Sequence, residues 1–468
     1  MIQMKRSLDL PVKIRSLEIK NFKNVNKGKI IFVKNEEKEP NENIIGLYGQ
    51  NGSGKTTFVN ALDLLKTYIT NDLVMLVNRK SEFNDYFSVD SNKAEIIAEF
   101  DILLKNLICK ISYKISFMQD SFSKNYYVLK EELKYTYGEE VGVIGYNNKK
   151  GISVSDNLND FYNKNINNYI VAISMAKQTN QSIIFNDGII GDLSKKNTDS
   201  LILEILRQLK IFAKFDMFVI TNRHFGMINL QWNLPFTFRY SKSKKVISNN
   251  EQLGTQEILT SGSQTLDLRQ PQKVTTMFYE QLTSMFQNIN EVLNRIIPNT
   301  KIDIIETDCL LENGSNGKAI ELVTNRNGSM IPMRNESTGI LKIISIIQTL
   351  IAYCTFDDIF VAIDELDAGI FEYLLGTLLE LLAKEGKGQL FFTSHNLRPL
   401  EILNKNSIYF STTNPDNRYI KFSNVKSNNN LRDFYFRTIV LGGQKENIYN
   451  DDDMAGLEIV LRKLAKNG

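Results

Sequence analysis

The sequence is poor in the residues that build disulfide frameworks and metal sites. Its 468 residues include three cysteines and two histidines. The cysteines, Cys109, Cys309 and Cys354, are odd in number and far apart, which excludes a disulfide scaffold and a Cys-rich zinc module. The histidines, His224 and His395, are too few for a site built from several imidazoles. This cysteine usage fits a reducing compartment, so we expect a cytoplasmic protein.

Long apolar runs and low-complexity stretches are also missing. The most apolar helical stretch, residues 340–356, is interrupted by Lys342 and Gln348, so it predicts a buried helix and not a membrane span. The first eleven residues carry charges and no apolar core, and we therefore expect no signal peptide. Eight prolines and 26 glycines are too few for a low-complexity protein. We expect a folded chain with no membrane partner.

Neither sign of charge dominates. Lys plus Arg total 56 and Asp plus Glu total 53, which gives a net charge of +3. Such a balance is no whole-chain signature of a nucleic-acid binder, although it leaves room for a local patch. The run Lys242-Ser243-Lys244-Lys245 and the basic residues before Gly28 could contact phosphates. Runs of this kind more often form solvated surface, so DNA stays open as a partner.

What is present is an α/β pattern with one interruption. Val12–Phe22 alternates apolar and polar residues, and Ile44–Tyr48 is an apolar run followed by a glycine-rich turn and a helical stretch. Three more alternating stretches up to residue 135 predict an antiparallel meander. Strands and helices alternate again from residue 301. The pattern predicts an N-terminal half over 1–138, a helical or irregular insertion over 139–300, a C-terminal half over 301–412 and a tail over 413–468.

A complete phosphate-binding loop lies between the predicted strand and helix near residue 50. Residues 49–56 read GQNGSGKT and match the pattern G-x-x-x-x-G-K-T in the context that the motif requires. The glycines allow successive N–H groups to face the phosphates, and the helix N-terminus adds its positive end. Lys55 is expected to reach the β- and γ-phosphates of ATP, and the Thr56 hydroxyl to ligate Mg²⁺. The expected nucleotide-binding residues of this loop are Gly49, Asn51, Gly52, Ser53, Gly54, Lys55, Thr56 and Thr57.

Two carboxylates follow an apolar strand in the C-terminal half. The run 359–363 ends in Asp364 and Glu365. The strand would fix Asp364 where it can hold Mg²⁺, directly or through water. Glu365 would point elsewhere and activate the attacking water as a general base. A solvated acidic pair is the alternative, and the presence of the phosphate-binding loop disfavours it.

His395 follows a second apolar strand, thirty residues after Glu365. The intervening helix places it at the end of a neighbouring strand, where an imidazole could contact the γ-phosphate or the attacking water, and a structural histidine is the alternative. His224 also follows an apolar run, within the insertion, and we expect a structural role for it because no partner is visible.

Taken in order, these motifs resemble the head of an ABC-type ATPase, and more narrowly the RecF/SMC/OLD branch. That branch includes the AAA-family ATP-binding proteins of bacterial anti-phage (abortive infection) defence. The opening strand, with Ile14, Leu17, Ile19 and Phe22, is similar to that of the branch, and the resemblance covers about residues 1–135 and 300–412. It implies a split P-loop NTPase with a mixed central sheet, an N-terminal antiparallel β subdomain and a mostly helical insertion.

The resemblance also implies a signature motif and a D-loop. Glu336-Ser337-Thr338-Gly339 stands before the helix where the signature is expected, although it departs from the usual Leu-Ser-Gly-Gly-Gln. Ser337 and the Gly339 N–H would contact the γ-phosphate of ATP held by another protomer, while a plain N-cap serine is the alternative. Asp367 would be the D-loop residue at the dimer face. No Q-loop glutamine can be assigned among Gln119, Gln178 and Gln181.

The motifs and the resemblance together predict an enzyme that hydrolyses ATP to ADP and phosphate, with Mg²⁺, at sites formed between protomers. We expect a homo-oligomer, at least an ATP-dependent dimer, whose nucleotide state controls a nuclease-like effector in trans, in anti-phage defence. A RecF-like DNA-binding ATPase of repair or recombination is the alternative. The atypical signature disfavours a transporter subunit, and Glu365 disfavours a scaffold without turnover. The run 451–453, three aspartates, lacks the preceding strand that a nuclease domain in cis would need.

Overall fold

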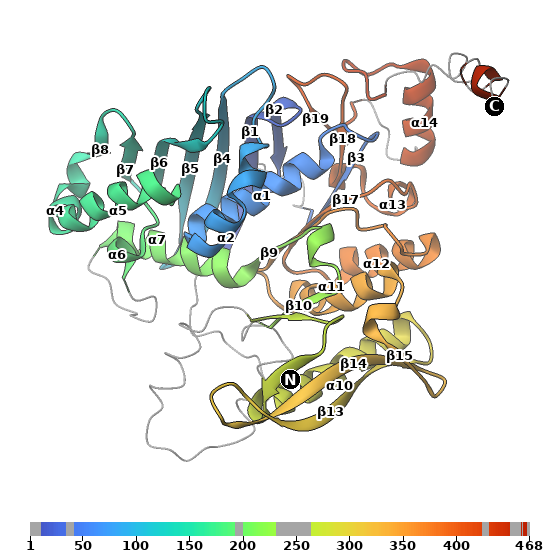
Figure 1. Cartoon of the computed structure of the whole chain (residues 1–468). Coiled ribbons are helices and arrows are strands. Elements are labelled where there is room, and N and C mark those ends of the chain that lie inside the picture. The colour runs from blue at the N-terminus through green and yellow to red at the C-terminus, as the bar shows by residue number, and fades with distance from the viewer. Residues whose placement is uncertain are drawn as a thin grey trace.

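The computed structural model describes residues 11–33, 42–191, 200–230, 264–423, 430–449, 460 and 462–465. The basic run 242–245 and the acidic run 451–453 lie outside these residues. The described elements form a six-stranded sheet, a seven-stranded sheet and two smaller sheets, with helices packed between and around them (Figure 1).

The six-stranded sheet is the core sheet, in the order β19-β18-β3-β17-β16-β9. All its strands are parallel except β19, which pairs antiparallel with β18 at one edge. The strands are β3 (Ile44–Tyr48), β9 (Met217–Ile220), β16 (Phe360–Ile363), β17 (Gln389–Thr393), β18 (Ile408–Ser411) and β19 (Tyr419–Ile420). Because parallel strands share one carboxyl edge, the turns that follow β3, β9, β16 and β17 meet at that edge.

Both faces of the core sheet are buried, which is why its strands are uninterrupted apolar runs. Phe360 and Ala362 of β16 point into one core with helix α1 (Lys55–Thr70). Val361 and Ile363 point into the other core with α11 (Thr338–Thr355) and α12 (Glu372–Glu385). The sheet thus holds its polar turns on a support that cannot shift without disturbing two cores.

The seven-stranded sheet is antiparallel, in the order β2-β1-β4-β5-β6-β7-β8. Its strands are β1 (Val12–Phe22), β2 (Val25–Ile31), β4 (Lys93–Leu104), β5 (Leu107–Gln119), β6 (Tyr126–Tyr137), β7 (Glu140–Asn147) and β8 (Gly151–Val154). Burial alternates along β4 as one face packs toward α1 and the other stays open. The predicted meander is confirmed by the pairing of β4, β5 and β6, and the sheet continues beyond residue 138 to Val154.

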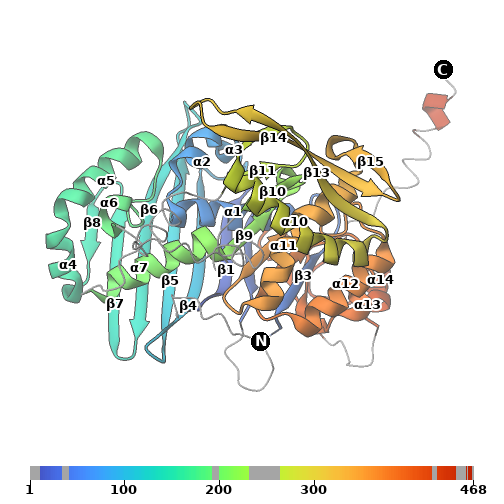
Figure 2. The same cartoon turned by 90° about the horizontal axis from the view of Figure 1, so that it is seen from below.

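Helices cover the inner face of the antiparallel sheet (Figures 1 and 2). They are α2 (Leu73–Asn78), α3 (Lys80–Asn84), α4 (Asn159–Lys164), α5 (Ile166–Thr179), α6 (Asp187–Ile190) and α7 (Leu201–Ile211). A π-helical turn leads from α7 into β9, which pairs with β16. The range expected to be an insertion, 139–300, therefore supplies one strand of the core sheet. The apolar run before His224 indicated a strand end within the insertion, but its pairing with β16 could not be read from four buried apolar residues.

The two smaller sheets lie beyond α11, on the side away from α1 (Figure 1). One pairs β10 (Met227–Leu230) with β11 (Gln264–Asp267). The other has the order β12-β14-β13, with β15 paired to β14. Its strands, together with the helix that follows β12, are β12 (Gln272–Thr275), α10 (Thr276–Ile296), β13 (Thr300–Leu310), β14 (Asn316–Arg326) and β15 (Ser329–Pro332).

Helix α11 is the one described helix that is long and apolar enough to cross a membrane by length and composition. Inside the protein, 72% of this helix is buried. Ile344, Ile347 and Tyr353 belong to the core beneath the parallel sheet. The core helix of a soluble protein passes the same test, and the burial of α11 matches the buried helix predicted from the sequence.

The chain after residue 398 adds two strands to the core sheet and then forms a helix. The elements there are α13 (Pro399–Ile402), β18, β19 and α14 (Leu431–Leu441). β18 pairs directly with β3, so segments more than 350 residues apart lie side by side. The tail expected over 413–468 therefore contributes β19 to the sheet. A split P-loop NTPase fold with a mixed central sheet and an antiparallel β subdomain, as predicted, is confirmed.

Candidate nucleotide-binding and hydrolysis site

The phosphate-binding loop joins β3 to α1 at the carboxyl edge of the core sheet. Gly52 and Gly54 have φ angles of 74° and 91°, which side chains other than glycine rarely adopt. At Gly49, whose φ is 152°, a Cβ atom would lie 1.8 Å from Ser411 Oγ. The loop therefore needs glycine at these three positions, for backbone conformation and for the close approach of β18.

Lys55 begins helix α1 and is 6% exposed. Its Nζ donates to the carbonyl oxygens of Gly49 at 2.7 Å and Gln50 at 2.9 Å. Burial lowers the pKa of Lys55 to about 8, against the opposing effect of Asp364, Asp367 and Glu365. The ammonium group is therefore held inside the loop, where it loses hydration and gains carboxylate neighbours.

Asn51 and Thr56 are exposed, whereas Ser53 and Thr57 are buried. Ser53 Oγ lies 2.5 Å from Ser411 Oγ and donates to Gln50 O at 2.7 Å, which ties the loop to β18. Thr57 Oγ1 donates to Asn24 Oδ1 at 2.9 Å. In this structure Thr57 therefore faces the turn between β1 and β2, whereas Thr56 faces the acidic strand end.

Asp364 follows β16 and is 2% exposed. Its carboxylate accepts from Thr393 Oγ1 at 2.6 Å and shares a side-chain hydrogen bond with Thr56. Burial raises the pKa of Asp364, and a nearby cation would hold the carboxylate ionised.

Thr56 and Asp364 are hard oxygen donors, which Mg²⁺ prefers. The described residues hold no group of three or more His, Cys, Asp and Glu side chains placed for a metal. Mg²⁺ bound through one carboxylate, phosphates and water needs no such group, so the residues present fit it.

Glu365 adopts a left-handed backbone conformation, with a φ of 48°. A non-glycine residue in this region carries strain and is retained only where its surroundings impose it. Two hydrogen bonds to the Glu365 backbone hold this conformation. The Glu365 N–H donates to Thr393 Oγ1 at 2.7 Å, and Lys342 Nζ donates to the Glu365 carbonyl. The turn directs the Glu365 side chain to Asn222, whose Nδ2 donates to Oε2 at 3.2 Å.

His395 is exposed and lies in the turn after β17. Its backbone N–H and that of Asn396 donate to Asp367 Oδ2, at 3.1 Å and 2.9 Å. Although part of the residue is exposed, partial desolvation of the imidazole and the positive charge of Lys55 lower the pKa of His395, so the imidazole is mostly neutral near pH 7. Asp367, expected at the dimer face, thus holds the His395 turn within its own chain.

Ser337 and Gly339 stand at the N-terminus of α11. Ser337 is exposed and caps the helix by accepting from the Ile340 N–H at 3.4 Å. Gly339 is buried, and a Cβ atom there would lie 2.0 Å from the carbonyl oxygen of Gly369. The helix therefore begins in direct contact with the loop that follows Asp364 and Glu365.

The sequence did not reveal several residues that shape the site. Asn24 donates to the Gly52 carbonyl, and Tyr419 OH donates to Gly54 O at 2.7 Å. Asn222 supplies the side-chain amide at Glu365. Gln119, one of the glutamines considered for the Q-loop, donates to the backbone of residues 84 and 124 instead. These contacts come from segments remote in sequence, and only the apolar run before Thr221 hinted that Asn222 follows a strand.

The loop after β3 and the paired carboxylates after β16 define the class of this protein as a P-loop nucleotide-binding ATPase. A family model described as the AAA ATPase domain matches residues 13–398, which is more than half of the chain. The chain therefore belongs to the AAA ATPase domain family.

Solved structures of Smc head domains are similar to this chain. One from Pyrococcus furiosus, bound to the C-terminal domain of ScpA, covers 88% of this chain and 96% of its own, with 13% identity and a TM-score of 0.38. One from Thermotoga maritima covers 88% and 99%, with 11% identity and a TM-score of 0.33. No curated protein matches the chain.

Proposed function

We propose that this protein is an ABC-type ATPase that hydrolyses ATP to ADP and phosphate, with Mg²⁺, at sites completed between two protomers. Its nucleotide state would control an effector protein in trans, a nuclease-like partner in anti-phage defence, inside the cytoplasm. The observation that carries the proposal is the convergence of Lys55, Thr56, Asp364, Glu365 and His395 at one edge of the core sheet.

Each of these groups has a part in the proposed reaction. The loop N–H groups and Lys55 would bind the phosphates, and the ammonium would exchange the carbonyls of Gly49 and Gln50 for phosphate oxygens. Mg²⁺, when bound by Thr56 and Asp364, would neutralise charge on the phosphates. Glu365 would accept the proton of the attacking water, and neutral His395 would donate a hydrogen bond to the γ-phosphate.

The second half of each site would come from another protomer. Ser337 is exposed at the N-terminus of an 18-residue helix, where N–H groups and the helix dipole favour an anion. Among the described residues, the hydroxyl is engaged as a cap by the Ile340 N–H. ATP on Lys55 of one protomer would therefore meet Ser337 and the Gly339 N–H of the other, and the dimer would close.

The output would pass to another protein. We place recognition of the partner or trigger within residues 139–300, apart from β9, between the head halves 1–138 and 301–412. The resemblance to the ATPases of two-component defence systems supports an effector in trans.

Glu365→Gln tests the proposed chemistry directly. It keeps the size of the side chain and removes the base, so turnover should fall by about 100-fold or more. ATP should still bind, and light scattering should show an ATP-dependent dimer that persists. Glu372→Gln is the matched control, because Glu372 is an exposed carboxylate in the first turn of α12, and it should behave as wild type. Wild-type turnover in Glu365→Gln would refute the mechanism.

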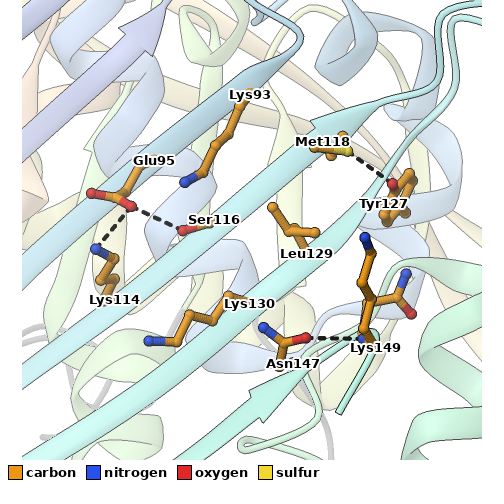
Figure 3. A pocket seen from close by; sticks show the side chains of 11 residues that line it. Lys93, Glu95, Lys114, Ser116, Met118, Tyr127, Leu129, Lys130, Asn147 and Lys149 are labelled. Atoms are coloured by element: carbon orange, nitrogen blue, oxygen red, sulfur yellow. Dashed lines mark hydrogen bonds and ion pairs between the residues drawn. The ribbon is translucent and has the colours of Figure 1, made fainter. Parts of the chain in front are cut away.

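A groove on the open face of the antiparallel sheet favours a second candidate function, a RecF-like DNA-binding ATPase. The groove has a volume of about 570 Å³ and is lined by Lys93, Lys114, Lys130 and Lys149 (Figure 3). Its single acidic residue, Glu95, is paired with Lys114 at 2.9 Å. Lys93 and Lys149 are exposed and have no carboxylate partner among the described residues. Such a surface suits a phosphate backbone.

The Lys93→Glu, Lys149→Glu double variant tests this second candidate. A labelled duplex oligonucleotide should bind the wild type with an affinity that falls steeply with salt, and the double variant should bind at least about tenfold more weakly. The control for net charge is the Lys384→Glu, Lys387→Glu variant, which reverses two exposed lysines at the end of α12 and so changes the net charge by the same amount. Equal binding by the double variant and the control would exclude this groove as the DNA site.

A further inference from the structure

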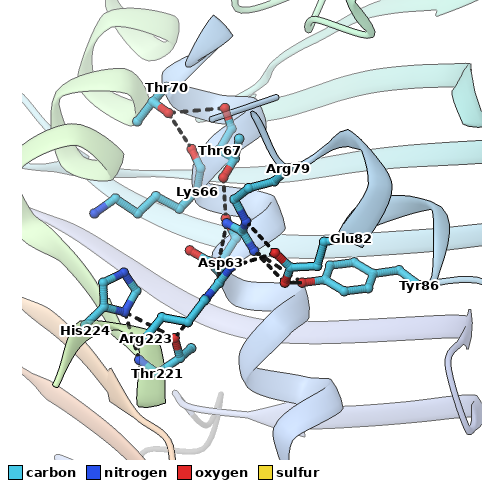
Figure 4. Close-up of polar contacts among 10 residues, drawn as sticks. All are labelled: Asp63, Lys66, Thr67, Thr70, Arg79, Glu82, Tyr86, Thr221, Arg223 and His224. Atoms are coloured by element: carbon cyan, nitrogen blue, oxygen red, sulfur yellow. Dashed lines mark hydrogen bonds and ion pairs between the residues drawn. The ribbon is translucent and has the colours of Figure 1, made fainter. Parts of the chain in front are cut away.

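Four charged side chains form a network beside the site, and the proposed chemistry uses none of them (Figure 4). Asp63, on α1, accepts from Arg79 Nη1 at 2.7 Å and from Arg223 Nη2 at 3.1 Å. Glu82, on α3, accepts from Arg79 Nε at 2.9 Å and from Arg223 Nη1 at 2.6 Å. Two guanidinium groups thus share two carboxylates across three segments of the chain.

The two arginines differ in burial. The Arg79 side chain is 9% exposed and already contacts both carboxylates, so it serves the packing of α1 against α3. The Arg223 side chain is 43% exposed. Removal of an exposed partner leaves no unpaired buried charge, because Arg79 remains in place. Arg223 is therefore not needed to balance a buried charge, and its two ion pairs are open to another use.

Arg223 belongs to the short turn Asn222–His224 that follows β9. The turn is closed by a hydrogen bond from the Thr221 N–H to His224 Nδ1, at 3.0 Å. This gives His224 the structural position that the sequence led us to expect. The residue before Arg223 is Asn222, the donor to Glu365 Oε2. The turn is therefore attached to α1 and α3 through Arg223 and to the acidic turn after β16 through Asn222.

We propose that Arg223 is a positioning residue, which fastens the 221–224 turn to α1 and α3 so that Asn222 holds the carboxylate of Glu365. The inference rests on the proposed function, since it takes Glu365 to be the general base. A carboxylate that must accept a proton from water gains from a fixed orientation. Asp63 lies eight residues along α1 from Lys55, about 12 Å at the helical rise. Helix α1 thus links the phosphate-binding loop to the orientation of Glu365.

A double-mutant cycle tests the proposal. Arg223→Ala and Asn222→Ala should each lower kcat by about tenfold and leave the KM for ATP within about twofold, because both residues lie in the turn after β9 and not in the phosphate-binding loop. If Arg223 acts through Asn222, the double variant should be no slower than the slower single variant. Arg223→Lys should recover part of the rate, because an ammonium can pair with one of the two carboxylates. Arg269→Ala is the matched control: Arg269 is 39% exposed and paired with Asp267, and its loss should leave kcat unchanged.

Hydrogen exchange supplies a readout that does not depend on turnover. The backbone amides of residues 221–224 should exchange faster in Arg223→Ala than in the wild type and in Arg269→Ala. Unchanged exchange, a wild-type kcat in Arg223→Ala, or a roughly hundredfold, additive loss in the double variant would overturn the proposal. Failure of the proposed function shows differently, as normal turnover in Glu365→Gln.

Discussion

The parallel core sheet and the antiparallel sheet share helix α1 between them, yet they meet solvent in different ways. The core sheet is covered on both faces, and the polar turns that carry the candidate site lie at its carboxyl edge. The antiparallel sheet is covered on one face, and its other face carries alternating charged residues such as Glu95, Glu99 and Lys114. A reacting group needs fixed neighbours, which the edge of a sheet buried on both faces provides. An open face provides area and charge, which suits binding of a large partner.

The largest expected effect is on ATP turnover, when a lysine at the carboxyl edge of the core sheet is compared with a lysine on the open face of the antiparallel sheet. Lys55→Ala removes the cation of the phosphate-binding loop, and ATP turnover should fall by about 100-fold or more. Lys110→Ala removes an exposed lysine of β5 and should leave turnover unchanged. Steady-state assays at saturating ATP, with each variant shown to be folded by circular dichroism, compare the two. Equal losses would remove the functional distinction between the sheets.

Packing should show the same contrast in stability. Phe391, on β17, is fully buried, with ring centroids 5.2 Å from Phe58 and 5.9 Å from Phe32. Phe391→Ala should lower the free energy of unfolding by about 3–5 kcal/mol. Ile108, on the open face, is 52% exposed, and Ile108→Ala should cost about 1 kcal/mol. Urea denaturation measures both, and similar losses would contradict the difference in burial between the two sheets.

The smallest expected effect is a pH dependence of ATP affinity, which arises from Lys55 at the carboxyl edge of the core sheet. Because the pKa of Lys55 is lowered to about 8, its ammonium is intact below that pH and is lost as the pH rises through it. ATP favours the protonated form, so affinity should be flat from pH 6 to 7.5 and should weaken by up to about tenfold per pH unit above 8. Lys55→Arg should remove the dependence, because a guanidinium stays charged. Calorimetric titration across this range measures it, and a flat wild-type profile would contradict the burial effect.

The contrast between contiguous and remote residues explains how much the sequence could predict. The phosphate-binding loop and the Asp364–Glu365 pair were predicted because each is a short run whose neighbours are a strand and a helix, and local pattern fixes both. The alternation of β4, β5 and β6 predicted the antiparallel sheet for the same reason.

Residues that reach the site through tertiary pairing could not be predicted. Asn222 meets Glu365 only because β9 pairs with β16, and Tyr419 meets the loop only because β19 extends the sheet beside β18. The left-handed conformation of Glu365 is likewise imposed by Thr393 and Lys342, from two other elements. Spacing in the sequence carries no trace of such contacts.

The central claim, that each site is completed by a second protomer, is tested most directly by mixing two inactive variants. Lys55→Ala keeps Ser337 intact, and Ser337→Arg keeps Lys55 intact. Each alone should lack turnover, while a mixture should regain part of it, because a mixed dimer contains one site with both intact halves. Turnover by Ser337→Arg alone, or no recovery in the mixture when light scattering shows mixed dimers, would contradict the account.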